Sequence, residues 1–369
     1  MLNHCIEEPP STNRGVQRQN IDTDYLSSCI DWCQITLKGT HSLETVIESI
    51  LKIPLDLMLG DIPMKGFSGH RVIAGFGNIK VAVPTGKNSY DGYQLLMSGS
   101  GCRDYEYFLK ANNETWIDFF QRVKTYDINF PRIDLAIDDR KTYLKVRDLI
   151  KLCKENLISS KFKVTTSYSS QTHTEDETLS CGDTLYLGSS SSEIRIVFYE
   201  KGYEQAKKYN IESPIDWNRY EIRFRNDSAR KVIDELCSHN NIAVVACGIL
   251  KDKVRFLELP ADKSQSRKRL FPTYPAWEEF INNIQKIKLS MNPNPIDEYL
   301  ERNRAWLIKN VAPSIKMQII WDEMTTPEHG ILDEIENTKL NTKQLLALET
   351  FKIHQSFKKS NLNKTPFNH

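Results

Sequence analysis

The sequence lacks long apolar runs, cysteine pairs at metal-binding spacing, and an excess of either charge. No apolar stretch in its 369 residues approaches the roughly 20 residues that a helix needs to span a bilayer. The eight cysteines include no CxxC pair and no Cys/His cluster at zinc spacing, which excludes the common structural zinc sites. Because no signal peptide is present either, we expect reduced thiols in a soluble, cytoplasmic protein without a membrane partner.

Charge and composition leave the class of partner open. The formal net charge is +1, and charged residues make up 26% of the chain against 40% hydrophobic residues. These values are ordinary for a soluble globular protein, so any basic surface for a nucleic acid must be local. The length allows two or three domains with a sizeable core.

The pattern of expected elements divides the chain into four parts. Residues 1–24 are polar and without periodicity, which predicts a flexible leader. Residues 25–240 mix strand and helix patterns and predict an α+β domain with a mainly antiparallel sheet. Residues 241–350 show helical patterns, which predict a helical C-terminal domain, and residues 351–369 form a basic tail.

Three expected strands of the α+β domain alternate apolar and polar residues, as a strand with one buried face does. They are "RIDLAID" (132–138), "EIRIVFY" (193–199) and "RYEIRFR" (219–225). Their polar faces carry Asp134, Asp138, Tyr199 and Glu221 among several arginines. If the three strands are neighbours, the three acidic side chains converge beside the tyrosine.

Convergence of Asp134, Asp138 and Glu221 would favour a metal site. Carboxylates on adjacent strands repel one another unless something compensates, and Mg²⁺ or Mn²⁺ prefers oxygen ligands. Such a metal can polarise a phosphodiester and orient it for in-line attack. The alternative is an ordinary solvated sheet face, on which the acids pair with neighbouring arginines. Those arginines are Arg132, Arg219 and Arg223.

Tyr199 has two candidate roles. A tyrosine that points away from the apolar face can be a surface residue, or a nucleophile whose phenolate is stabilised by positive charge. Its usual pKa is near 10, so it needs cations or metal-bound phosphate close by. Tyr186 and Tyr203 are rival nucleophiles, although packing is favoured for the first and a helix surface for the second. Tyr220 shares the apolar face with Ile222 and is predicted to be core.

Several motifs, in this order, resemble the Rep_trans family, which comprises rolling-circle plasmid replication initiators and the related MobT relaxases of integrative conjugative elements. The motifs are "RIDLAIDD", a "YLG" thirteen residues ahead of the tyrosine in "FYEKGYEQ", and "NRYEIRFR". Further segments similar to the family are "IDWCQITL", "MSGSGCRDYE" and a C-terminal helix with Trp277 and Phe280. The resemblance covers roughly residues 29–310.

The resemblance implies site- and strand-specific nicking of DNA. A tyrosine attacks a phosphodiester, stays linked to the 5′ phosphate and leaves a 3′ hydroxyl, and the reverse reaction rejoins ends. Carried over to this chain, the nucleophile is Tyr199, and Asp134, Asp138 and Glu221 hold Mg²⁺ or Mn²⁺. The implied partners are double-stranded origin DNA, single-stranded DNA at the nick site, a second copy of the chain and a host helicase.

The sequence departs from the family pattern beside the tyrosine. Plasmid initiators of this group tend to have an Arg two residues before it, where this chain has Val197. Arg195, two residues further back on the same face, is the candidate substitute as a catalytic residue. Lys201 is a candidate contact to the scissile phosphate. No His-hydrophobic-His motif is present, so the chain is not a HUH nuclease with a histidine-bound metal.

Other basic residues are candidate DNA contacts. Arg103, in the Gly-rich segment "SGSGCR", can add charge where backbone N–H groups approach phosphate, and Arg223 lies on the polar face. Residues 251–271 hold seven Lys and Arg against three Asp and Glu. The basic run within this segment consists of Arg267, Lys268 and Arg269. It is predicted to grip duplex DNA, with a solvated linker as the alternative.

The leading hypothesis is therefore a DNA nicking-joining enzyme that starts rolling-circle replication or conjugative transfer, with residues 241–350 recognising the origin. Two other classes stay open. One is a metal-dependent nuclease or transposase-like enzyme that uses activated water, in which Tyr199 is structural. The other is a non-catalytic DNA-binding replication factor that keeps the fold. The sequence does not choose between a replication initiator and a conjugative relaxase.

Overall fold

The computed structural model describes most of the central part of the chain. The described residues are 25–58, 66, 67, 69–86, 92–173, 178–209, 213–262, 264–284, 307–325 and 330–340, with the single positions 304, 345, 348 and 352. The predicted leader at 1–24 and nearly all of the basic tail lie outside them. None of the helices in the described part is long and apolar enough to cross a membrane.

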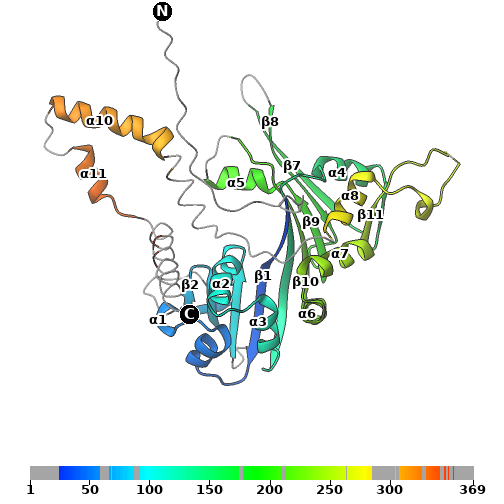
Figure 1. The fold of residues 1–369 in the computed structure, drawn as a ribbon, viewed down its shortest axis with the longest axis horizontal. Coiled ribbons are helices and arrows are strands. Elements are labelled where there is room, and N and C mark those ends of the chain that lie inside the picture. Colours follow the sequence, from blue (N-terminus) through cyan, green and yellow to red (C-terminus); the bar gives the residue numbers. More distant parts are fainter. Residues whose placement is uncertain are drawn as a thin grey trace, which may run out of the picture.

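A nine-stranded sheet organises the described residues (Figure 1). Its order is β2-β3-β4-β1-β5-β10-β9-β8-β7, and every neighbouring pair is antiparallel. The strands are β1 (Leu26–Lys38), β2 (His70–Phe76), β3 (Ile79–Pro84), β4 (Gly92–Ser98), β5 (Ile128–Asp139), β7 (Thr165–His173), β8 (Thr178–Leu187), β9 (Ile194–Tyr199) and β10 (Asn218–Arg225). A small second sheet pairs β6 (Ile158–Ser160) with β11 (Val254–Phe256). The predicted α+β class with a mainly antiparallel sheet is confirmed.

The three strands that alternate apolar and polar residues are neighbours in the middle of the large sheet. β10 pairs with β5 on one side and with β9 on the other. The apolar side chains on β5, such as Leu135, are buried together with Tyr220 and Phe198 of the other two strands. The opposite face of all three strands therefore carries the polar residues, as the alternation predicts.

Helical segments connect and follow these strands. They are η1 (Thr45–Leu51), α1 (Leu55–Met58), α2 (Ser100–Ala111), α3 (Trp116–Val123), α4 (Val146–Lys154), α5 (Lys201–Tyr209), α6 (Asn226–His239), α7 (Ile242–Lys253), η2 (Lys268–Leu270), α8 (Pro275–Ile284), η3 (Leu307–Val311), α10 (Ala312–Thr325) and α11 (Ile331–Asn337). In Figure 1, α6, α7 and α8 lie on one side of β9 and β10, and α5 lies on the other side. Of these four helices, α5 alone lies on the polar side of β9 and β10.

Aromatic contacts fix α8 directly behind the strands that carry the candidate site. The ring of Trp277 lies 6.2 Å from that of Phe198, and the ring of Phe280 lies 4.8 Å from that of Tyr220. Both helix residues are almost fully buried. Since buried aromatic pairs are packed to nearly crystalline density, β9 and β10 rest on a stiff support.

Two elements escape prediction from sequence. β7 is almost entirely polar ("TTSYSSQTH"), and α7 is mainly apolar with half of its residues buried, so neither shows the expected amphipathic period. Buried residues of α7, β11 and α8 belong to the same hydrophobic core as the sheet. The predicted boundary near residue 240, and a recognition role for the region that follows it, stay predictions.

Candidate active site

A bulge in β1 places an acidic side chain on the polar face. The pairing of β1 with β5 is regular except for register shifts, one of which falls between Ile30 and Trp32 and leaves Asp31 unpaired. The main chain of Asp31 accepts a hydrogen bond from the N–H of Gly99 at 2.7 Å, and Arg103 donates to the carbonyl of Ile30. Bulges re-aim a side chain next to active sites, and this one turns the Asp31 carboxylate toward the neighbouring strands.

The pairing register arranges the polar side chains of β5, β10 and β9 in three rows across the sheet. From β5 through β10 to β9, the rows are Asp138–Arg219–Tyr199, Ala136–Glu221–Val197 and Asp134–Arg223–Arg195. Successive rows are two residues apart along each strand, or roughly 7 Å. Glu221 is therefore one row away from Tyr199, and Arg195 is two rows away from it.

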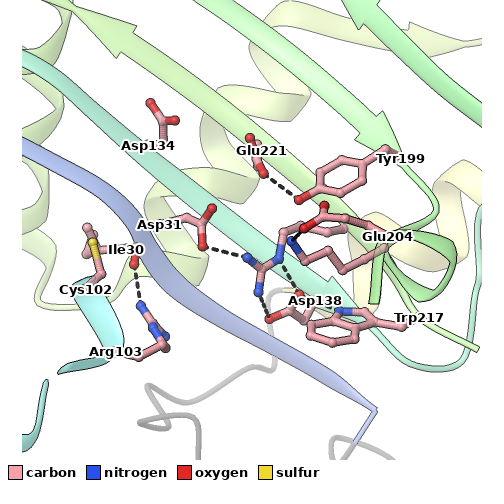
Figure 2. Close-up of polar contacts among 12 residues, drawn as sticks. Ile30, Asp31, Cys102, Arg103, Asp134, Asp138, Tyr199, Glu204, Trp217 and Glu221 are labelled. Atoms are coloured by element: carbon pink, nitrogen blue, oxygen red, sulfur yellow. Dashed lines mark hydrogen bonds and ion pairs between the residues drawn. The ribbon is translucent and has the colours of Figure 1, made fainter. Parts of the chain in front are cut away.

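Tyr199 and Glu221 form a short, direct hydrogen bond. The Tyr199 hydroxyl donates to Oε1 of Glu221 at 2.7 Å (Figure 2). The other carboxylate oxygen, Oε2, accepts from Nη2 of Arg223 at 2.7 Å. The Nζ of Lys201 lies 5.5 Å from the centre of the Tyr199 ring and pairs with Glu204. The tyrosine thus has an anionic acceptor at its hydroxyl and a cation beside its ring.

The charges around this pair set its protonation. Burial and the charge of Glu221 raise the pKa of Tyr199 well above its usual value, so the phenol keeps its proton at neutral pH. Burial alone would raise the pKa of Glu221, but Arg223, Arg219 and the Tyr199 hydroxyl outweigh it and lower that pKa. Glu221 is therefore an ionised acceptor facing a protonated donor, which is the arrangement of a general base and its substrate.

Asp138 is tied to Arg219 instead of joining the other acids. Its two oxygens accept from Nε and Nη2 of Arg219 at 2.7 and 2.9 Å, and Oδ1 also accepts from Trp217 at 2.6 Å. Arg219 uses its remaining nitrogen, Nη1, to bind Asp31 at 2.6 Å. Asp138 thereby fixes a buried arginine next to Tyr199, and its own pKa is lowered because Arg219 and Trp217 outweigh its burial.

The structure revises the predicted set of metal ligands. Asp134 and Asp138 are four residues apart on one strand, roughly 13 Å at about 3.3 Å per residue, and a metal–oxygen bond is only about 2.1 Å. One ion therefore cannot reach both carboxylates. Asp134, Glu221 and the unpredicted Asp31 share one part of the face, whereas Asp138 lies beside Trp217 (Figure 2).

The arginine pairs anticipated for an ordinary sheet face are all present. Arg132 binds Asp134 at 2.5 Å, Arg219 binds Asp138, and Arg223 binds Glu221. Within the described part of the chain, no three His, Cys, Asp or Glu side chains are grouped so that they could hold a metal ion. The arginines do not fully offset the burial of these carboxylates. Burial raises the pKa of Asp134 to about 6 even though the charge of Arg132 lowers it.

A cavity of about 1480 Å³ opens over the polar face. Asp31, Asp134, Tyr199, Glu221 and Arg223 line its floor, and β7, β8 and α5 supply its walls. Asp138 is not among the described residues that line it. The volume exceeds the roughly 300–1,000 Å³ that is usual for small-molecule sites, so the cavity has room for a segment of a polymer.

The remaining predicted DNA contacts lie apart from this floor. Arg103 is 6% exposed, and its guanidinium pairs with Glu106 at 2.8 Å, so it supports the β1 bulge from below. In the basic run, the Nζ of Lys268 donates to Asn156 and to the carbonyl of Ile158. That run borders the small β6–β11 sheet and does not line the cavity.

The other tyrosines considered as nucleophiles differ in whether they lie in the core or line the cavity. Tyr220 is fully buried, as predicted, and donates to Asp139 at 2.7 Å. Tyr186 and Tyr203 both line the cavity beside Tyr199. Tyr186 carries the guanidinium of Arg195 on its ring at 4.0 Å.

Asp31 was not predicted from the sequence, although the sequence contains a signal. From Ile30 onward the buried positions in β1 are Ile30, Cys33, Ile35 and Leu37, so the period of two is broken between the first and second. Such a break is what a bulge produces.

Comparisons with known proteins place these observations in a family. Residues 128–335 match the family described as "Replication initiation factor", and residues 27–122 match "Rolling Circle replication initiation protein N-terminal domain". A protein of Bacillus subtilis (strain 168) with the name "Putative DNA relaxase NicK" is 34% identical over 352 residues, which cover 94% of this chain and 97% of that protein. A solved rolling circle replication initiator protein from Geobacillus stearothermophilus has a TM-score of 0.60 at 26% identity, covering 73% of this chain and 100% of the other.

Proposed function

This chain belongs to the replication initiation factor family of rolling-circle initiators and relaxases, and we propose that it nicks and rejoins one strand of DNA through a covalent bond to Tyr199. The observation that carries the proposal is the hydrogen bond from Tyr199 to ionised Glu221 on the floor of a polymer-sized cavity. Among the described tyrosines that line this cavity, only Tyr199 has a hydroxyl that donates to a carboxylate.

The proposed chemistry is a transesterification. The Tyr199 oxygen attacks the phosphorus of a phosphodiester as its proton passes to Glu221. The bond from phosphorus to the 3′ oxygen breaks, and that oxygen takes a proton from solvent. The products are a 5′ phosphotyrosine ester and a free 3′ hydroxyl. Rejoining is the reverse, with protonated Glu221 returning a proton to Tyr199 as it leaves.

Positive charge near the attacked phosphate lowers the cost of forming the phenolate. Arg219 is buried in the row of Tyr199 and is held in place by Asp138 and Asp31. Lys201 lies beside the tyrosine ring. Fixed cations of this kind stabilise charge that develops in the transition state better than mobile solvent does.

The resemblance to rolling-circle initiators implies a divalent metal, and carboxylate oxygens of the kind that Mg²⁺ or Mn²⁺ prefers line the cavity. Asp31, Asp134 and Glu221 all line the cavity. As they stand they are not grouped to hold an ion, so they would hold one only after their side chains turn away from Arg219, Arg132 and Arg223. Burial and the charge of Glu221 raise the pKa of Asp31, which reflects repulsion that a cation would relieve. When bound, Mg²⁺ or Mn²⁺ supplies charge that polarises a phosphodiester.

Incubation with supercoiled DNA carrying the origin of the protein's own replicon tests the proposal. We expect relaxed, nicked DNA and a protein–DNA adduct on denaturing gels that disappears after protease treatment. Metal-dependent nicking without an adduct would instead support a nuclease that uses activated water. Binding without any nicking would support a replication factor that does not cut DNA.

A further inference from the structure

The cavity extends beyond Tyr199 into an aromatic region that the proposed chemistry does not use. Tyr168 of β7 lines the cavity and is 62% exposed, and its ring meets Tyr186 of β8 edge-on at 5.8 Å. Trp32 of β1 lines the cavity as well. An exposed aromatic ring on an otherwise polar strand adds little to the hydrophobic core, so its position calls for another explanation.

Arginines face one another beside these rings. Arg223 stands directly opposite Arg195 between β10 and β9, and Arg225 stands directly opposite Arg132 between β10 and β5. Like charges in opposite positions of neighbouring strands destabilise a sheet. Asp134 and Glu221 neutralise Arg132 and Arg223, which leaves Arg195 and Arg225 without a carboxylate partner among the described residues.

Arg195 is the least compensated of the four. Within the described part of the chain it makes no ion pair, and its buried Nε has no hydrogen-bond partner. Its guanidinium lies on the Tyr186 ring at 4.0 Å. Burial, together with the charges of Arg223 and Arg225, lowers the pKa of Arg195, which is the direction expected when no carboxylate neutralises a guanidinium.

Arg195 lies two rows away from Tyr199 and is directed onto the Tyr186 ring, which favours contact with a neighbouring phosphate over the one that is attacked. The two residues are four positions apart on β9, or roughly 13 Å. A guanidinium beside two aromatic rings, one of them exposed, suits the phosphate and the base of an unpaired nucleotide, because only unpaired bases can stack on side chains.

We propose that Tyr168, Tyr186 and Arg195 form a subsite for one unpaired nucleotide of the strand that is cut, separate from the phosphate that Tyr199 attacks. The base stacks on the exposed ring of Tyr168, beside Tyr186, and the phosphate lies near Arg195 and Arg223. This inference rests on the proposed nicking function for the identity of the strand. It assigns to Arg195 the binding of a second phosphate, two rows away from the nucleophile.

Binding of a single-stranded oligonucleotide that spans the nick site tests the subsite. All proteins carry Tyr199→Phe, so the DNA is not cut. Removing the exposed ring by Tyr168→Ala should weaken binding about 5- to 150-fold, whereas Tyr168→Phe should bind normally. The matched control is Tyr25→Ala, since Tyr25 is 49% exposed and does not line the cavity.

The salt dependence of the same binding reports on the phosphate contact. Arg195→Gln should reduce the slope of log affinity against log salt by about 0.7, the value for one contact on a single strand. Arg195→Lys keeps the charge and should keep the slope. Arg230→Gln, on the exposed side of α6, makes the same charge change away from the cavity and should leave the slope unaltered.

Oligonucleotides with a single abasic site or a single neutral methylphosphonate locate the nucleotide. An abasic site at one position should weaken binding by the protein that keeps Tyr168 and have no effect on binding by Tyr168→Ala. A methylphosphonate at one position, not at the nick, should weaken binding by the protein that keeps Arg195 and have no effect on binding by Arg195→Gln. The subsite is refuted if both variants bind the whole set as their controls do. These binding results do not depend on covalent chemistry, so absence of an adduct in active protein would refute the nicking proposal alone.

Discussion

Replacing Glu221 by Gln separates its role as a base from its role as a hydrogen-bond acceptor. Glutamine has nearly the same shape and can still accept from the Tyr199 hydroxyl, which donates to Oε1 at 2.7 Å. It cannot take the proton. Because a positioned general base typically contributes about 10²- to 10⁴-fold to a rate, we expect single-turnover nicking to slow by that factor. Oligonucleotide binding should be unchanged or tighter, since a negative charge leaves the cavity.

The same substitution should also cost stability. The pKa of Glu221 is lowered in the folded protein, although burial opposes this, because Arg223 and Arg219 favour the carboxylate. A lowered carboxyl pKa contributes stability above the unfolded pKa, near 4.3, and this is lost as pH falls through the folded value. Since hydrogen bonds to charged groups contribute about 1.5–3 kcal/mol, we expect a loss of about 1–3 kcal/mol at pH 7 that shrinks in acid.

Single-turnover cleavage and urea unfolding at pH 7 and at low pH measure both effects. Glu235→Gln is the matched control, because Glu235 lies exposed on α6 and pairs only with His239 in the same helix. It should change neither quantity appreciably. If Glu221→Gln nicks DNA at the rate of the control, Glu221 is not the base. If its stability equals or exceeds that of the control, the carboxylate is repelled in the folded state, contrary to the charges described above.

Three further predictions concern the ligands, the buried acid and the helical region. Asp31→Asn should weaken Mn²⁺ binding at least 10-fold by isothermal titration, and unaltered binding would remove Asp31 from the metal site. Since burial raises the folded pKa of Asp134 to about 6 from a usual 3.8, the folded state binds its proton more tightly. The unfolding free energy of Asp134→Asn minus that of the unmodified protein should therefore increase between pH 4 and pH 6, by at most about 3 kcal/mol. A difference that does not change with pH would contradict this. Changing the whole basic run to alanine should flatten the salt dependence of duplex binding, while cleavage of a short single-stranded oligonucleotide persists. An unaltered slope would make the run a solvated linker.

The positions of the candidate residues on the sheet could be predicted because a strand with one buried face repeats every two residues. Alternation alone separated Leu135, Phe198 and Tyr220 from the polar residues beside them, and all three are buried. The same reasoning could not show that β5, β10 and β9 are neighbours, since pairing depends on contacts between distant segments. The order of the strands in the sheet supplies that information.

Which acids share the cavity could be predicted only in part, because register decides which of them meet. Asp138 shares a face with Asp134, but the strand's rise keeps them apart, and Arg219 opposite Asp138 neutralises it. Asp31 replaces it in the cavity through a bulge, which depends on the pairing of β1 with β5. Tyr168 was missed for another reason: β7 has no apolar face, and a polar strand gives no periodic signal.

Locating the covalent bond tests the central claim most directly. Active protein is incubated with an oligonucleotide spanning the nick site, the adduct is trimmed with nuclease and protease, and the modified peptide is sequenced by mass spectrometry. We predict a nucleotide attached through its 5′ phosphate to Tyr199, and no adduct with Tyr199→Phe, which should lose at most about 3 kcal/mol of stability. Attachment to Tyr186 or Tyr203, or an adduct that persists in the Tyr199→Phe protein, would contradict the account.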